Sequence, residues 1–249
     1  FDGQDDYIDF DYSYDISNDF TWQGYFKIAD INQNYAFFNQ NSFYNADGYY
    51  INYYNNTFWF SAGQGASLQQ ELAQPFPVVA NEWFHLAIVK DNYSINFFIN
   101  GVDVTLGSNA GLQSSPFTNY INTNQHLTFG LEPGGSSHFN GNTSSISIFN
   151  TALTQQEIQN YMNCPPTGSE TGLVGYWNFE EGTGTIAYDQ TSNGNNGTIN
   201  GATYDLNVPS QSCALTNVNG CDSTATLNLT INQADTSYTN ITTCDSSYT

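Results

Sequence analysis

Apolar and polar positions alternate with a period of two along most of this chain, and turn-forming pairs such as Asn-Gly, Asp-Gly and Gly-Gly separate the alternating segments. This period places successive side chains on opposite faces of a strand, so it is typical of half-buried β-structure. The pattern predicts strands at residues 7–12, 20–28, 49–54, 57–61, 83–90, 94–100, 126–129, 144–149, 174–179 and 224–231.

One segment, TQQEIQNYM at residues 154–162, indicates a helix instead. Thr154 is a suitable N-cap, and Glu157 three residues later completes a capping box. Many short strands with one late helix are typical of an antiparallel sandwich or jelly roll. We therefore expect an all-β jelly-roll sandwich with one short helix and a small β-rich tail.

Composition narrows the function classes. The chain has 249 residues, of which 39% are hydrophobic and 16% aromatic, which is enough for a sizeable core. Lys27 and Lys90 are its only strong cations, and the formal net charge is −21. This balance excludes nucleic acid and anionic lipid as partners, because nothing neutralises phosphates. No apolar run approaches 18 residues, so we expect no membrane insertion.

Four cysteines, Cys164, Cys213, Cys221 and Cys244, fit no zinc-site spacing, and disulfides in a secreted, extracellular protein are the better interpretation. Cys164–Cys213 with Cys221–Cys244 is the preferred pairing, since the first bridge would fasten residues 172–182 to the body. Cys213–Cys221 is the main alternative, because only seven residues separate these two cysteines.

A loop of oxygen donors follows the aromatic run at residues 176–179. Asp189, Thr191 and Asn193 occupy positions 1, 3 and 5 of this loop, with Gly194 at position 6 and Asn196 beyond it. Calcium takes six to eight oxygen ligands, often around a glycine turn, so the spacing favours a calcium site. The alternative is a polar Asn/Gly turn that holds no metal.

Five segments together resemble a laminin-G-like domain of the concanavalin A-like lectin/glucanase superfamily. They are FDGQDDYIDF (1–10), FTWQGYFKI (20–28), NEWFHLAIVKDNYSINFFINGVDV (81–104), FNGNTSSISIFNTALTQQEIQNYM (139–162) and GLVGYWNFEEGTGTIAYDQTSNGNNGTINGATY (172–204). The resemblance implies a jelly roll over residues 1–206, closed by a strand at 173–180. It also implies glycan or protein binding, often beside calcium.

One departure from that family concerns calcium. Family members usually carry an acidic pair before the strand that leads to the helix, and this chain has Ser144 and Ser145 at those positions. A calcium site would then rely on the Asp189 loop with help from Asp2 or Asp5.

Residues 207–249 form a different segment, which we expect to be a strand-rich repeat tail. The phrase Cys-Asp-Ser occurs at Cys221 and again at Cys244, 23 residues later. It resembles the repeat arrays of large Bacteroidetes surface adhesins exported by type IX secretion. We expect a part of a longer cell-surface protein.

Catalysis is not expected. The Glu-x-Asp-x-Glu strand of related glucanases is absent from the sequence, His85 lies in an apolar run, and His126 and His138 have no nucleophile at a useful spacing. Strand alternation predicts that Tyr50, Tyr54 and Trp59 face outward, where their rings could stack on sugars. The alternative is that these rings are buried in the core.

Two functional hypotheses follow from these observations. The first is a lectin-like adhesion module that binds glycans or surface proteins with calcium assistance. The second is a structural subunit of an extracellular stalk or filament, which would bind other copies of itself through the strand at residues 224–231.

Overall fold

The computed structural model describes residues 1–41, 48–64, 67–92, 94–105, 125–132, 137–211 and 213. The chain divides into two compact units, Phe1–Cys213 and Ala214–Thr249. The first unit therefore includes residues 207–213, which the sequence assigns to the tail. The expected strand at residues 224–231 lies outside the described residues.

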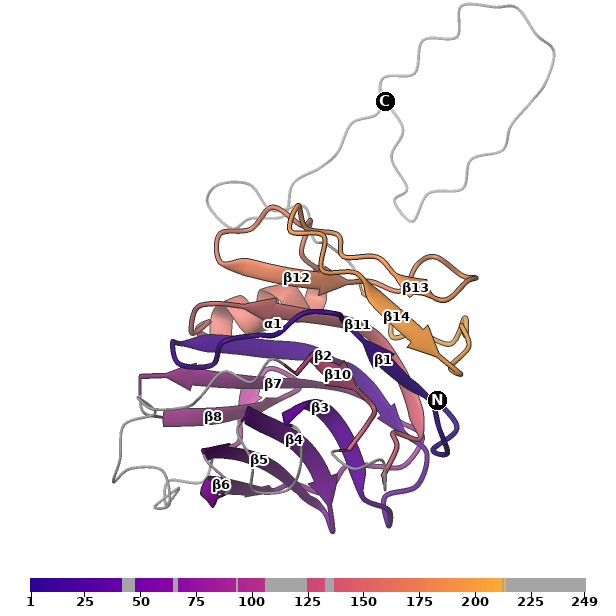
Figure 1. The fold of residues 1–249 in the computed structure, drawn as a ribbon. Helices are drawn as coiled ribbons and strands as arrows, with labels where there is room; N and C mark the ends of the chain where they lie inside the picture. Colours follow the sequence, from indigo (N-terminus) through magenta and orange to yellow (C-terminus); the bar gives the residue numbers. More distant parts are fainter. Residues whose placement is uncertain are drawn as a thin grey trace, which may run out of the picture. The chain divides into compact units, whose positions relative to one another are not determined.

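Two antiparallel sheets form the first unit (Figure 1). The larger sheet has the strand order β13-β14-β1-β10-β3-β4-β5-β6, and the smaller has the order β12-β11-β2-β7-β8-β9. The bounds are β1 Tyr7–Asp9, β2 Phe20–Ile28, β3 Tyr35–Asn41, β4 Gly48–Tyr54, β5 Thr57–Gln64, β6 Ser67–Pro75, β7 Trp83–Asp91, β8 Ser94–Ile99, β9 Val102–Asp103, β10 Thr128–Phe129, β11 Gly141–Phe149, β12 Leu173–Trp177, β13 Ile186–Ala187 and β14 Gly197–Asn200. The expected jelly-roll sandwich is confirmed.

The space between the sheets is filled mainly by aromatic rings. Phe26 of β2 packs at 5.0 Å from Phe37 of β3 and 5.7 Å from Phe129 of β10, so rings from both sheets meet. In β4, Tyr49 and Tyr53 are buried in this core while Tyr54 is 53% exposed. In β4 the period-two alternation of the sequence therefore separates side chains that enter the core from side chains on the outward face.

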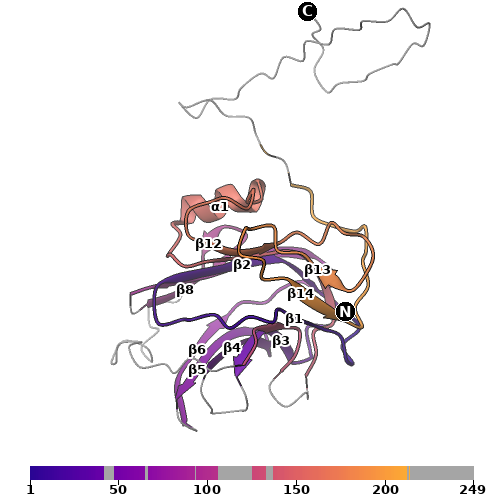
Figure 2. The same cartoon turned by 45° about the horizontal axis from the view of Figure 1, so that its top comes forward.

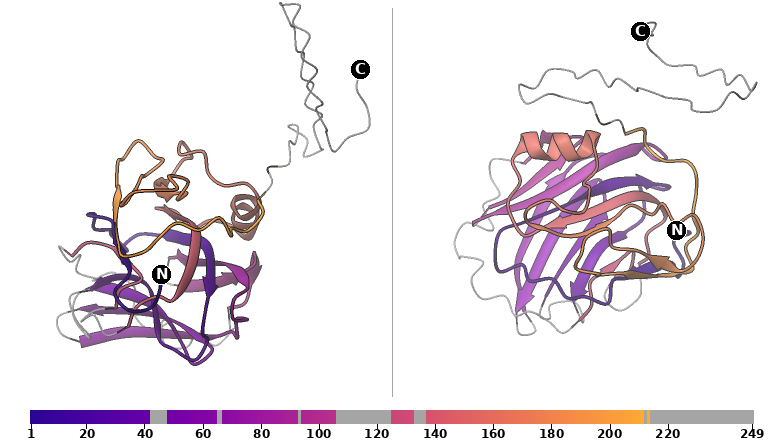
Figure 3. Two further views of the ribbon diagram at one scale, coloured as in Figure 1. Left: turned by 90° about the vertical axis from the view of Figure 1, so that its right-hand side faces the viewer. Right: turned by 90° about the horizontal axis from the view of Figure 1, so that it is seen from above.

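The helix α1, Gln155–Asn163, covers the outward face of the smaller sheet (Figures 2 and 3). Thr154 caps it: the Glu157 N–H donates to Thr154 Oγ1 (3.3 Å), and the Thr154 N–H donates to Glu157 Oε2 (2.8 Å). The fully buried Ile158 joins a second apolar cluster against Val89 and Phe149. The predicted capping box is confirmed. No helix in the described part of the chain is long and apolar enough to cross a bilayer.

The sequence missed two of the longer strands, β3 and β6. In β3 every residue from Tyr35 to Gln40 is buried, so burial does not alternate there, and a bulge between Ala36 and Phe38 also shifts the register against β4. Strand β6 is rich in polar residues and forms one edge of the larger sheet. The expected strand at 174–179 ends early, at Trp177, because Phe179 takes a left-handed backbone (φ 55°).

Candidate functional site

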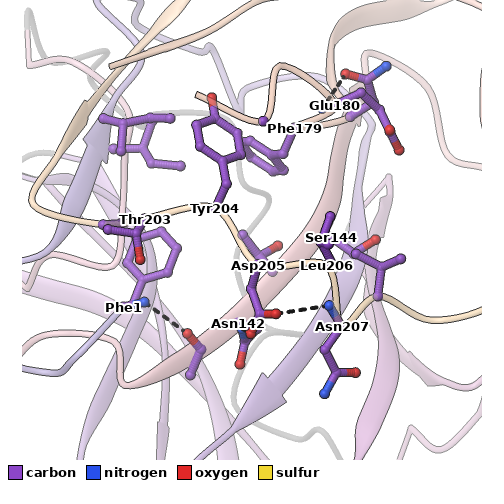
Figure 4. Close-up of a pocket in the computed structure, with 18 of the residues that line it drawn as sticks. Phe1, Asn142, Ser144, Phe179, Glu180, Thr203, Tyr204, Asp205, Leu206 and Asn207 are labelled. Atoms are coloured by element: carbon purple, nitrogen blue, oxygen red, sulfur yellow. Dashed lines mark hydrogen bonds between the residues drawn. The ribbon is translucent and has the colours of Figure 1, made fainter. Parts of the chain in front are cut away.

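A cavity of about 440 Å³ lies where the ends of the two sheets meet (Figure 4). Its walls come from the start of β11, the loop at residues 178–182 and a strap at residues 202–208. The volume falls within the usual range for small-molecule sites, about 300–1,000 Å³. The lining combines the aromatic residues Trp83, Phe179 and Tyr204, the amides Asn142, Asn178 and Asn207, and the carboxylates Glu180 and Asp205.

The strap at residues 202–208 follows β14 and is held by side chains from three other segments. Asn142 Nδ2 donates to Asp205 Oδ2 (3.3 Å), and Trp83 Nε1 donates to Asn207 Oδ1 (3.4 Å). Tyr204 Oη donates to Glu181 Oε2 (3.3 Å). These contacts join the strap to β11, to β7 and to the loop after β12, so the pocket depends on the position of the strap.

Strand β11 forms its wall with a glycine and a bulge. Gly141 has φ 151°, and a Cβ there would run into the Lys27 carbonyl oxygen of β2, so a side chain is excluded. The register of β11 against β2 shifts between Thr143 and Ser145, and Ser144 has no partner residue in β2. Ser144 lines the pocket, and its small side chain leaves the space open.

The loop after β12 carries backbone strain at the pocket wall. Phe179 has φ 55°, a conformation that is costly for a bulky residue and that clusters at functional sites. The next residue, Glu180, is exposed, and its backbone N–H donates to Asn178 Oδ1 (3.3 Å). The turn therefore presents an aromatic ring and a carboxylate to the same cavity.

Hydrogen bonds, burial and neighbouring charges shift the pKa of two pocket groups. The Asn207 N–H bond (2.9 Å), together with the bond from Asn142 and the charge of Lys27, lowers the pKa of Asp205 below its usual range. Partial burial, with the nearby charge of Glu181, raises the pKa of Tyr204 to about 12. At neutral pH the pocket therefore holds an ionised Asp205 and a protonated tyrosine hydroxyl.

The predicted calcium loop is held by its own hydrogen bonds. Asp189 Oδ1 accepts the N–H groups of Tyr176 and Thr191 (both 3.0 Å), and Oδ2 accepts Thr191 Oγ1 (2.8 Å) and the Asn195 N–H (2.9 Å). Asn196 Oδ1 accepts the Asp189 N–H (3.0 Å). Asn193 Nδ2 donates to the Val174 carbonyl (2.8 Å), so this side chain also binds the chain itself.

A calcium ion would have to displace bonds from both Asp189 oxygens. The observed arrangement matches the alternative interpretation of a polar turn, and the oxygen set does not fit a metal without rearrangement. Calcium binding in this loop stays a prediction.

Asp2 and Asp5 lie at the other end of β14 from the Asp189 loop. They group with Asp6, and carboxylate oxygens of the three residues lie within 4.8 Å of one another. The sheet register places Tyr7, the residue after Asp6, opposite Asn200, whereas Asn196 precedes the first residue of β14. The structure therefore does not join the two sets of predicted calcium ligands into one site.

The three predicted aromatic platforms share the outward face of the larger sheet. Tyr50 and Trp59 are half-buried, and Tyr54 is exposed. Tyr50 pairs with Ser61, two residues beyond Trp59 on β5, so their side chains are diagonal neighbours. This face belongs to strands β4 and β5, neither of which lines the cavity, and its binding role stays a prediction.

The structure contains the disulfide Cys164–Cys213, the pairing that the sequence favoured. It ties the C-cap of α1 to the segment that continues the strap. Cys221 and Cys244 lie outside the described residues.

The structure places His85 in the core and His126 on the surface. His85 is 2% exposed, and burial lowers its pKa to about 3. His126 lies 3.1 Å from Asp9 and 3.2 Å from Asp11 on the surface, and neither contact involves a nucleophile. His85 therefore lies in the core, where its Nδ1 has no hydrogen-bond partner within the described residues.

Sequence reasoning did not find the pocket. The sequence identifies Trp83 only as the start of a core strand. It divides the strap between the jelly roll (residues 202–206) and the tail (residues 207–208), and gives neither part a role in binding. Tyr204 and Asp205 reach the cavity only because the strap turns back over β11. The available signal was the run of aromatic, acidic and glycine residues at 176–184, which lies beside the strap in space.

A laminin-G-type profile of the concanavalin A-like lectin/glucanases superfamily matches residues 2–159, and the chain belongs to that family. No curated protein sequence matches the chain.

Among solved structures, the chain is similar to a putative carbohydrate binding protein from Bacteroides ovatus ATCC 8483, with 16% identity and a TM-score of 0.60. That match covers 85% of this chain and 60% of the other. A second is the heptameric SAP-like pentraxin of Limulus polyphemus, with 14% identity, a TM-score of 0.48, and coverage of 65% and 77%. At these identities the first match supports the fold, and function has to be argued from the site.

Proposed function

We propose that the chain is a non-catalytic glycan-binding module of an extracellular protein and that the cavity beside β11 is its sugar site. The observation that carries this proposal is the lining, which sets aromatic rings, amides and carboxylates around one cavity of about 440 Å³. The superfamily and the Bacteroides ovatus neighbour, described as a putative carbohydrate binding protein, support it.

The lining suits the two kinds of surface that a sugar presents. A pyranose ring has an apolar C–H face, which packs on aromatic faces, and a polar edge of hydroxyls, which bond amides and carboxylates. Trp83, Phe179 and Tyr204 supply the first kind of contact, and Asn142 and Glu180 supply the second.

The same residues argue against hydrolysis. A glycosidase needs one carboxylic acid that is protonated and ready to donate. The bonds from Asn207 and Asn142 hold Asp205 in the ionised form and lower its pKa, which is the opposite of what a general acid requires. Binding without cleavage is the function that this chemistry favours.

The disulfide Cys164–Cys213 supports an extracellular location for the protein, because such bonds persist in oxidising compartments. We further propose that the module serves adhesion at a cell surface as part of a longer protein. Calcium assistance stays a prediction, with the Asp189 loop and the group of Asp2, Asp5 and Asp6 as its two candidate sites. The stalk-subunit alternative depends on residues 224–231, which lie outside the described residues.

A glycan array followed by titration calorimetry tests the sugar site. Ser144→Trp, which fills the cavity from the β11 bulge, should abolish binding of any glycan that the unaltered chain captures. Tyr54→Ala, on the outward face of the larger sheet, is the matched control and should bind as before. Loss of binding in Tyr54→Ala with retention in Ser144→Trp would move the site to the larger sheet and overturn the proposal.

A further inference from the structure

We propose that this pocket selects saccharides that carry no negative charge and rejects acidic sugars such as uronates, sialic acids and sulfated residues. The inference rests on the proposed function and deepens it by naming the ligand class. It is carried by the charges that line the cavity and by the positions of the two lysines.

Two carboxylates lie at the cavity, and they differ in their partners. Asp205 is exposed and accepts hydrogen bonds from Asn207 and Asn142. Glu180 is exposed, and no donor within the described residues bonds its carboxylate. An acidic sugar would therefore meet at least one unneutralised negative charge on entering.

The cations near the cavity are already engaged and do not offset that repulsion. The N-terminal ammonium of Phe1, a lining residue, donates to the Gly141 carbonyl (3.1 Å) and lies 3.8 Å from Asp6 Oδ2. The chain has only two lysines and no arginine. Lys90 is buried near the far end of β7 from Trp83, where its Nζ donates to the carbonyls of Ser17 and Asn18 (3.1 and 3.0 Å). Neither lysine is among the residues that line the cavity.

Lys27 is the nearer of the two lysines, and it is already engaged by two residues of the cavity wall. Its Nζ lies 5.1 Å from the centroid of the Trp83 ring, and the residue is only 9% exposed. Its charge also acts on Asp205, which already has the opposite sign. An incoming anion would compete with Asp205 and with the indole ring for this one cation.

The neutral part of the lining suits uncharged hydroxyl and amide groups. Asn142, Asn178 and Asn207 each offer a donor and an acceptor, and a carboxylate accepts hydrogen bonds from sugar hydroxyls. The pocket would then discriminate neutral from acidic sugars in two ways, because it attracts neutral hydroxyl and amide groups and repels anions.

The experiment compares sugars that differ only in charge. The probes are methyl glycosides of galactose and glucose, of the corresponding uronic acids, and of the methyl esters of those acids. Calorimetric titration of the whole chain at about 50 mM and about 500 mM salt separates charge from shape, because only repulsion is screened. The isosteric double variant Glu180→Gln/Asp205→Asn is measured beside the unaltered chain.

For the hexose that binds, we expect the acid to bind at least about tenfold more weakly than its methyl ester at low salt. The gap should narrow at high salt and in the double variant. Equal or tighter binding of the acid would overturn this inference and leave the proposed function standing. Failure of every neutral and acidic probe, together with an empty array of neutral glycans, would overturn both.

Discussion

The disulfide Cys164–Cys213 offers the sharpest test of how the pocket is held together. It closes a loop with a sequence separation of 49 residues. In the chain-entropy description, a cross-link of this span removes about 14 cal/mol/K from the unfolded ensemble, which corresponds to about 4 kcal/mol at 25 °C. The double variant Cys164→Ser/Cys213→Ser should lose unfolding free energy of that order.

Urea denaturation measures this loss directly, and a thermal melt should show a fall of roughly 8–16 °C, since about 1 kcal/mol shifts the Tm of a domain this size by about 2–4 °C. Sugar affinity should fall as well, because the bridge anchors the strap that carries Tyr204 and Asp205. The variant Cys221→Ser/Cys244→Ser is the control, and it should keep the pocket. A Cys164→Ser/Cys213→Ser variant with a Tm within about 2 °C of the parent would refute the reasoning.

Three further predictions concern other parts of the first unit. Asp189→Ala should lower the free energy of unfolding, measured by urea titration, by at least about 2 kcal/mol, because four donors lose their acceptor. If calcium instead stabilises the unaltered chain and has no effect on Asp189→Ala, the loop is a metal site. Buried His85 has a pKa of about 3 in the folded chain against about 6.5 unfolded, so the unfolded state binds the extra proton between those values. The free energy of unfolding should therefore fall by about 1.4 kcal/mol per pH unit as the pH drops below 6.5. His85→Gln should reduce this dependence of stability on pH between pH 6.5 and 5, and an unchanged dependence would contradict the lowered pKa of His85. Gly141→Ala should lower the Tm by several degrees and weaken sugar binding, because the added Cβ would run into the Lys27 carbonyl oxygen. If calorimetry shows a variant that keeps both its Tm and its sugar affinity, the role of β11 as a wall of the pocket is wrong.

Alternation helped to predict the sandwich, although β2 and β7 do not show it, because almost every residue of these two strands is buried. β4 and β5 show it plainly: every second side chain, such as Tyr53 and Phe60, enters the core. The alternation fails in β3, where residues 35–40 are all buried and a bulge shifts the register, and in the short strands β13 and β14, which are too brief to show a period. The helix was predictable because its capping box is a local signal that needs no tertiary contact.

The pocket could not be predicted in the same way. Its residues come from β7, β11, the loop after β12 and the strap, and no spacing in the sequence connects these segments. Asp189 illustrates the opposite case, in which local spacing matched a calcium loop. The structure shows the same oxygens accepting N–H groups from the chain, because a turn and a metal site use similar donors.

The most direct test of a glycan site beside β11 is a crystal structure of the chain with a bound neutral oligosaccharide. The account predicts sugar density between Trp83, Phe179 and Asp205, with hydroxyls within hydrogen-bond distance of Asn142 or Glu180. Density on the outward face of the larger sheet beside Tyr54, with the cavity holding only solvent, would contradict it.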